Sequence, residues 1–230
     1  MIQPLPTLLA RAKRSRRPLL LCEISSIEQA EGCLAAAAAK KSSLALTVSS
    51  GTLDQLVVAE ALLPLVELLA QAATEAVAIE MRLGSPLTNI ENSFPIHTCL
   101  TLPVNTRPKS QGRTLAATCT SVGDALAADD CFQILRLPAE LSKSGLKEVL
   151  TQLKRPAVLE EASFSPARLK AIVLTGIAGI TLASQLDASF TAGVRTALRN
   201  RELVSPSGYL HRGKKAVFER VFNYLTYIET

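Results

Sequence analysis

The residues of this chain best able to bind a metal are two histidines and five cysteines. His97 and Cys99 are two positions apart, so both side chains would lie on the same face of a strand. One histidine and one cysteine supply half of the ligands that a tetrahedral zinc site needs. A site of three histidines cannot be built from His97 and His211. We therefore expect His97 and Cys99 to be packed within a strand, and we expect no metal site.

Charged residues fall near the C-terminal ends of several predicted strands: Glu23, Arg82, Arg136 and Glu160. Enzymes with parallel α/β barrels keep their functional side chains at this end of the strands. One interpretation is a polar pocket that binds a small ligand. The other is a set of ion pairs that fills the interior, because buried charges must be paired. Glu160 and Glu161 are adjacent and would point to opposite faces, so they are not expected to act as a carboxylate pair.

Positive charge is concentrated near the start of the chain, in Arg11 to Arg17, and the formal net charge is +5. Such a segment can bind nucleic acid or another anion. The alternative is a solvated face, which we favour because no partner motif accompanies the run. With no Trp and only 4% aromatic residues, the chain is poorly suited to stacking bases. We expect no nucleic-acid partner.

The cysteines also indicate a cellular compartment. Their number is odd and no C-x-x-C pair occurs, which argues against zinc ribbons and secreted disulfide frameworks. The apolar run that follows Arg17 stops at Cys22, too early for an export signal. The apolar stretch 171–183 is too short to cross a bilayer. These patterns predict a cytoplasmic protein with no membrane segment.

Short apolar runs alternate with longer helical patterns along the chain. This alternation predicts a mainly parallel sheet with helices outside it. The expected strands are 18–24, 43–48, 76–82, 96–104, 115–119, 131–137, 156–161 and 179–183. Eight strands allow a closed barrel, and an open doubly wound sheet is the alternative. No G-x-G-x-x-G or P-loop motif follows any strand, so the open sheet lacks a nucleotide-binding motif.

The expected helices are 26–40, 51–73, 122–128, 141–153, 165–174, 186–199 and 215–227. Ser26 and Gln29 have the spacing of a capping box. Pro64 is expected to kink or divide the second helix. The polar stretch 105–113 predicts a loop where a fourth helix would otherwise lie. Residues 1–17 are described only as a basic N-terminal segment, with no element assigned to them.

Four stretches of the sequence carry a family likeness: LLCEISSIEQAEGCL at 20–34, ALTVSSG at 45–51, VAIEMRLG at 77–84 and the segment 165–198. Together they resemble the class II, metal-dependent fructose- and tagatose-bisphosphate aldolases. The resemblance implies an α/β fold, a (β/α)8 TIM-type barrel trimmed in its middle. It also implies one domain over residues 1–230, and 48% hydrophobic residues suffice for its core.

The family's functional residues are missing at the matching positions. The resemblance places Arg82 at the catalytic aspartate and Leu83 at a metal-binding histidine. Pro138 follows the sixth strand where another metal-binding histidine is expected. The family's His-Gly-Gly-Ser-Gly after the seventh strand reads Leu-Glu-Glu-Ala-Ser at 159–163, and its Lys-x-Asn-x-x-Thr in the eighth strand becomes Gly179, Thr181 and Ser184. Only Ser49 keeps a substrate-contacting residue type.

We therefore interpret the chain as a degenerate, non-catalytic relative of these aldolases that binds, scaffolds or regulates. The alternative is an active lyase, or another enzyme, with a remodelled site at the strand C-termini. We expect no catalytic residue, no metal and no other cofactor. The expected partner is another protein or a second copy of the chain, and a small-molecule ligand is the alternative. The pocket candidates are Glu23, Ser49, Arg82, Arg136, Glu160 and Ser184.

Overall fold

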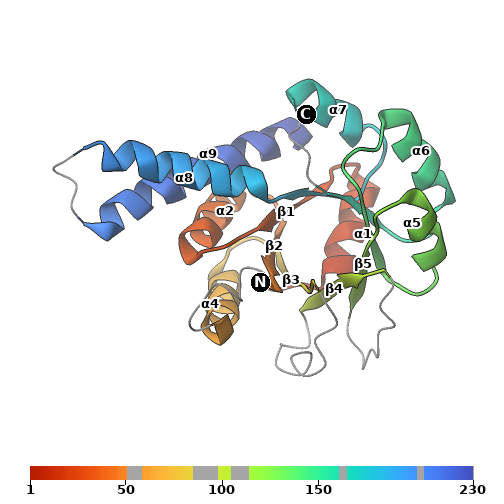
Figure 1. The fold of residues 1–230 in the computed structure, drawn as a ribbon, viewed down its shortest axis with the longest axis horizontal. Helices are drawn as coiled ribbons and strands as arrows, with labels where there is room; N and C mark the ends of the chain where they lie inside the picture. The colour runs from red at the N-terminus through yellow and green to blue at the C-terminus, as the bar shows by residue number, and fades with distance from the viewer. Residues whose placement is uncertain (51–58, 85–97, 105–113, 161–164, 201–204, 230) are drawn as a thin grey trace.

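A computed structural model describes residues 1–50, 59–84, 98–104, 114–160, 165–200 and 205–229. Eight parallel strands close into one barrel in sequence order, with β8 pairing β1 (Figure 1). The strands are β1 (Leu19–Glu23), β2 (Leu44–Ser49), β3 (Val77–Arg82), β4 (Cys99–Pro103), β5 (Leu115–Thr118), β6 (Ile134–Leu137), β7 (Ala157–Leu159) and β8 (Gly179–Leu182). The expected (β/α)8 TIM-type barrel is confirmed, and the open sheet is excluded.

Each strand is short and buried on both faces, because one face lines the barrel and the other meets the outer helices. The outer helices are α2 (Ile27–Lys40), α4 (Ala59–Ala72), α5 (Val122–Ala128), α6 (Lys143–Gln152), α7 (Pro166–Val173), α8 (Ser184–Leu198) and α9 (Pro206–Glu229). The predicted loop at 105–113 lies outside the described residues. The question of a trimmed middle therefore stays a prediction.

Two local predictions about helices can be compared with the structure. The Ser26 hydroxyl accepts the Gln29 backbone N–H at 3.3 Å, as expected of an N-cap. In a capping box the Gln29 side chain would accept the backbone N–H of Ser26. Here it accepts the backbone N–H of Ser25 instead, at 2.6 Å. Helix α4 continues through Pro64, while residues 51–58 lie outside the described part of the chain.

The basic segment near the start of the chain forms a helix that the sequence analysis did not predict. Helix α1 (Leu5–Ser15) buries Leu5, Leu8, Leu9 and Ala12 and leaves its cations in solvent. This spacing of apolar residues is typical of an amphipathic helix. In the sequence, the basic residues between the apolar ones obscure this period.

Helix α1 closes the N-terminal end of the barrel. Its apolar residues form one cluster with inward-facing residues from the start of the strands: Leu19, Leu21, Ala45, Ala78, Cys99, Ala116, Ile134, Val158 and Ala178. We call this cluster the floor of the barrel, and Gly179 lies against it. A Cβ on Gly179 would lie 2.8 Å from a methyl of Leu21 and 2.9 Å from a methyl of Leu9. The missing side chain at Gly179 thus makes room for α1.

Helices α8 and α9 form an antiparallel pair that projects to one side of the barrel (Figure 1). Their backbones approach closely at Gly193, where a Cβ would lie 2.6 Å from the carbonyl oxygen of Arg212. Gly32 of α2 allows a similar approach to α9. Helix α9 begins nine residues before the predicted start at Lys215. None of the described helices is both long and apolar enough to cross a membrane.

The packing of α1 gives a first testable prediction. Replacing the fully buried Leu9 with Ala should lower the free energy of unfolding by about 2–5 kcal/mol, because a cavity forms beneath the barrel. Leu174→Ala is the matched control, since Leu174 is 78% exposed. Urea denaturation of both variants measures the difference. Equal stability of the two variants would show that α1 is not part of the core.

Candidate functional site

A network of charged side chains fills the C-terminal half of the barrel interior. At its centre is Arg136 of β6, whose side chain is fully buried. Its Nη1 donates to both carboxylate oxygens of Glu80 on β3, at 2.6 and 2.5 Å. Its Nη2 donates to the hydroxyl of Thr181 on β8 at 2.8 Å. Because β3 and β6 are not neighbours in the sheet, the bond between Arg136 and Glu80 crosses the interior.

Glu80 has further partners besides Arg136. The hydroxyl of Thr47 on β2 donates to its Oε2 at 2.7 Å, and the hydroxyl of Thr101 on β4 donates to its Oε1. The four residues Thr47, Glu80, Thr101 and Arg136 are all buried. Every charge in this layer therefore has a charged partner and at least one hydroxyl, which is the condition for keeping ions away from water.

A second layer lies closer to the mouth of the barrel. The Nη1 of Arg82, at the end of β3, donates to Glu23 at 2.8 Å and to Glu160 at 3.4 Å. Glu160 links the two layers, because its other oxygen accepts a hydrogen bond from Nε of Arg136. The side chains of Arg82, Glu23 and Glu160 are 25%, 20% and 17% exposed. This layer is the part of the network that solvent can reach.

The structure brings together four of the six predicted pocket residues. Glu23, Arg82, Arg136 and Glu160 form one continuous chain of ion pairs. Ser49 ends β2 in register with Arg82, so it lies at the same rim. Ser184 differs, because it is the exposed first residue of α8, and no described hydrogen bond joins it to the network. Glu161 lies outside the described residues.

Sequence reasoning did not single out Glu80 as a pocket residue, nor the three threonines that bond to Glu80 or Arg136. Glu80 is two positions before Arg82, so both side chains face the barrel interior. A single glutamate within the apolar strand VAIEMR was the available signal. Thr47, Thr101 and Thr181 carry no such signal, because threonine is common in strands of every kind.

The charges in the network shift one another's pKa values. Burial would raise the pKa of Glu80, but the guanidinium of Arg136 and the hydrogen bonds from Arg136, Thr101 and Thr47 outweigh burial and hold that pKa below its ordinary value. Burial opposes the charge of Arg136, and the carboxylates of Glu80 and Glu160 more than compensate, so its pKa is raised. Both groups are therefore ionised at neutral pH.

Cys99, the cysteine in register with Glu80, is poorly suited to act as a nucleophile. Cys99 is in register with Glu80, inside the floor cluster beneath the network. Burial raises the pKa of Cys99 well above its ordinary value, and the charge of Glu80 raises it further. A thiol in this environment stays protonated and unreactive. His97 lies outside the described residues, and His211 is on α9, so the pairing of His97 with Cys99 stays untested.

The described donors at the mouth, Glu23 and Glu160 with Arg82 between them, do not form a set suited to a divalent metal. Within the described ranges there is no group of three or more His, Cys, Asp or Glu residues that could hold one. The two carboxylates nearest the mouth, Glu23 and Glu160, already share the guanidinium of Arg82. That fixed positive charge would repel a cation. Leu83, at the position that the resemblance gives to a histidine ligand, is buried and apolar.

Comparison with known proteins supports the fold. No protein-family model and no curated protein sequence matches the chain. Among solved structures, the YdjI aldolase from Escherichia coli K12 has a TM-score of 0.83 at 17% identity, covering 99% of this chain and 97% of that one. The fructose-bisphosphate aldolase from Campylobacter jejuni has a TM-score of 0.76 at 13% identity, covering 99% and 95%. The chain therefore has an aldolase-like TIM-barrel fold, and at these identities the likeness concerns the fold alone.

The buried pair gives a prediction about stability. Arg136→Met should lower the free energy of unfolding by about 3–5 kcal/mol, because Glu80 would be left buried without its charged partner. Adding Glu80→Leu should restore part of this loss. Arg195→Met on the exposed end of α8 is the control and should change stability by less than about 0.5 kcal/mol. Denaturant titration measures all four proteins. A loss no larger than that of the control would contradict a structural role for the pair.

The lowered pKa of Glu80 gives a prediction about acid. A carboxyl group whose pKa is lower in the folded state stabilises that state above its unfolded pKa, and the stabilisation is lost as pH falls. Stability should therefore decline as pH drops below the ordinary glutamate value of 4.5 and towards the lower folded pKa. In Glu80→Gln this decline should be shallower, as measured by thermal unfolding between pH 6 and about 2.5. An identical slope in both proteins would show that Glu80 is not the responsible group.

Proposed function

We propose that this chain is an aldolase-like barrel that does not catalyse aldol cleavage and that acts as a binding, scaffolding or regulatory protein. The observation that carries the proposal is the buried pair of Arg136 and Glu80. It lies across the barrel interior, bonded to Thr181 on one side and Thr101 on the other. A substrate could enter this layer only by separating the pair.

The charge of the network supports the same conclusion. Three carboxylates and two guanidiniums give the two layers a formal charge of −1. A ketose bisphosphate is itself strongly negative, so the interior offers it no net attraction. Arg82, the cation nearest the mouth, is already shared between Glu23 and Glu160. The residues that the resemblance gives to phosphate binding after the seventh strand include Glu160, which would repel a phosphate.

An enzyme with a remodelled site is the second candidate. The partial exposure of Arg82, Glu23 and Glu160 supports it, because a ligand with both positive and negative groups could exchange with their mutual contacts. This candidate predicts that a small molecule binds at the mouth and that binding depends on Arg82. If the protein is non-catalytic, these three side chains serve only to fill the barrel interior, and no such ligand binds.

A protein partner or a second copy of the chain is the expected binding partner. Leu65 and Leu68 support this expectation, because both are exposed and they are one helical turn apart on α4. Neighbouring exposed leucines on one helix face are more typical of a contact surface than a single exposed leucine is.

The proposal is tested by measuring metal content and aldol cleavage on the same purified protein. We expect no stoichiometric divalent metal and no cleavage of fructose or tagatose bisphosphate above the uncatalysed background, with a zinc-dependent aldolase as the positive control. Bound zinc together with cleavage would overturn the proposal.

A thermal-shift screen of small metabolites separates the two candidates. A ligand that stabilises the protein but not Arg82→Ala would favour the remodelled site. Lys143→Ala, a change at the exposed start of α6, is the control for a general effect of lost positive charge.

A further inference from the structure

The N-terminal end of the barrel carries a basic groove on the side opposite the network. It lies between the C-terminal part of α1, the C-terminal part of α6, the start of β7 and the turn between α7 and β8. Its volume of about 480 Å³ is within the range of small-molecule sites. Gly176 lies at the turn with φ of +83°, and a Cβ there would meet nothing within 4 Å, so this wall of the groove is open.

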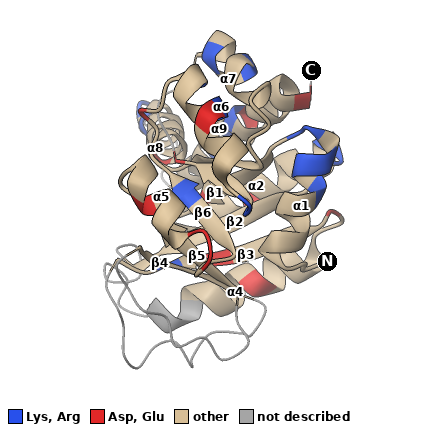
Figure 2. Cartoon of the chain, turned by 90° about the vertical axis from the view of Figure 1, so that its right-hand side faces the viewer, with Lys and Arg blue, Asp and Glu red and all other residues tan. Residues whose placement is uncertain are grey.

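Four cationic side chains line the basic groove: Lys13, Arg16, Lys147 and Arg155. No carboxylate is among the lining residues. None of the four forms an ion pair with any residue in the described part of the chain. The cations of α1 are exposed, and Figure 2 marks in blue the part of the helix that carries them. The groove thus combines a concave surface with unneutralised positive charge.

Arg155 is held in place at the edge of the groove. Its Nε donates to the backbone carbonyl oxygen of Asp129 at 3.1 Å. The carboxylate of Asp129 accepts the backbone N–H groups of Lys154 and Arg155, each at 3.0 Å. These bonds fix the backbone at Arg155 and leave its Nη groups for another partner, as a guanidinium that binds phosphate requires.

The partial negative charges at the nearby helix C-termini balance only part of the positive charge of the four cations. Helices α1, α6 and α7 all end at this side of the barrel, and each C-terminus carries roughly −0.5 of an elementary charge. Together they contribute roughly −1.5, against four positive side chains, so roughly 2.5 positive charges remain unbalanced. If the cations served only to stabilise helix ends, about two of them would suffice.

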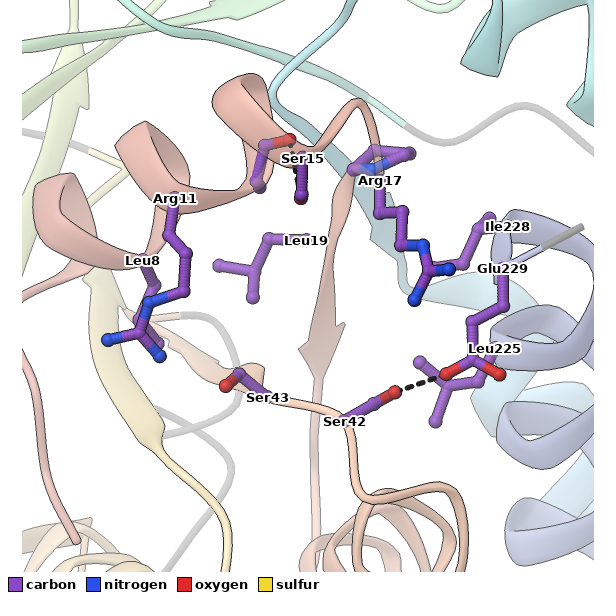
Figure 3. Close-up of a pocket in the computed structure, with 12 residues that line it drawn as sticks. Leu8, Arg11, Ser15, Arg17, Leu19, Ser42, Ser43, Leu225, Ile228 and Glu229 are labelled. Atoms are coloured by element: carbon purple, nitrogen blue, oxygen red, sulfur yellow. Dashed lines mark hydrogen bonds between the residues drawn. The ribbon is translucent and has the colours of Figure 1, made fainter.

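A second hollow on the other side of α1 provides a comparison (Figure 3). It is smaller, about 150 Å³, and Arg11 and Arg17 lie on opposite sides of it. Glu229 is part of its wall, where it accepts the hydroxyl of Ser42 at 2.5 Å and pairs with Lys40 at 3.7 Å. A carboxylate in the wall disfavours an anion there, whereas the basic groove has none.

We propose that the basic groove binds a compact ligand that carries two or more phosphate groups. A single phosphate would meet only some of the four cations, whereas linked phosphates can contact cations on both α1 and α6 at once. The described lining contains no aromatic side chain on which a nucleic-acid base could stack, which favours a small polyphosphate over RNA. The groove is at the opposite end of the barrel from the charged network, so this binding does not depend on the proposed function.

The proposal is tested by titrating the full chain with inorganic triphosphate and with orthophosphate in a calorimeter at about 0.15 M salt, where long-range attraction is screened. We expect triphosphate to bind at least about tenfold more tightly than orthophosphate, equivalent to about 1.4 kcal/mol. The double variant Lys13→Gln, Lys147→Gln should weaken triphosphate binding at least about tenfold, because it removes a cation from each wall.

The matched control removes the same charge from the projecting helix pair, as Arg195→Gln, Lys215→Gln. Both residues are exposed and belong to α8 and α9, outside the groove. This control should change triphosphate binding less than about twofold. Absence of triphosphate binding, or equal weakening in both double variants, would overturn the proposal. Tighter binding of a single-stranded RNA oligonucleotide, lost in Arg14→Gln, Arg17→Gln, would overturn it in favour of an extended nucleic-acid surface.

Discussion

The fold depends on the pairing of Arg136 with Glu80, because a buried charge without its partner would destabilise any interior. Through this pair and the residues bonded to it, the network joins seven of the eight strands or the positions next to them, all but β5. Neighbouring strands are already held by backbone hydrogen bonds. The network adds connections across the barrel, between strands that the sheet does not pair. The network thus lies at the end of the barrel where barrel enzymes keep their functional side chains, and it links the strands of the wall there.

The sequence identified all eight strands, because each is an apolar run bounded by polar residues and buried on both faces. It also placed Glu23, Arg82, Arg136 and Glu160 at the strand ends, and these side chains do meet. It could not show that Glu80 is the central partner, because the bond from β6 to β3 depends on barrel closure and on strand register. Helix α1 was not predicted for a different reason: its leucines have the helical period, but the cations between them give the segment the composition of a solvated basic arm.

The two ends of the barrel interior are packed with different kinds of side chain. At the N-terminal end, the leucines of α1 and small residues such as Ala45 and Ala78 form a floor of apolar contacts. Towards the C-terminal end, charged and hydroxyl side chains line the interior, beginning on β4 with Thr101, two positions after Cys99. On β3 and β4 the change from apolar to polar packing takes place within two residues, from Ala78 to Glu80 and from Cys99 to Thr101. Positive charge that could attract a ligand is found instead outside the floor, around α1.

The position of Gly179 bears on how the chain reaches its fold. Helix α1 precedes every strand in synthesis, yet the floor that receives Leu9 is incomplete until β8 has been made and paired with β1. Until then the apolar face of α1 has no finished partner and is open to wrong associations. Docking of α1 and closure of the barrel are therefore expected to be one late, cooperative event with contacts far apart in sequence, which makes folding slow.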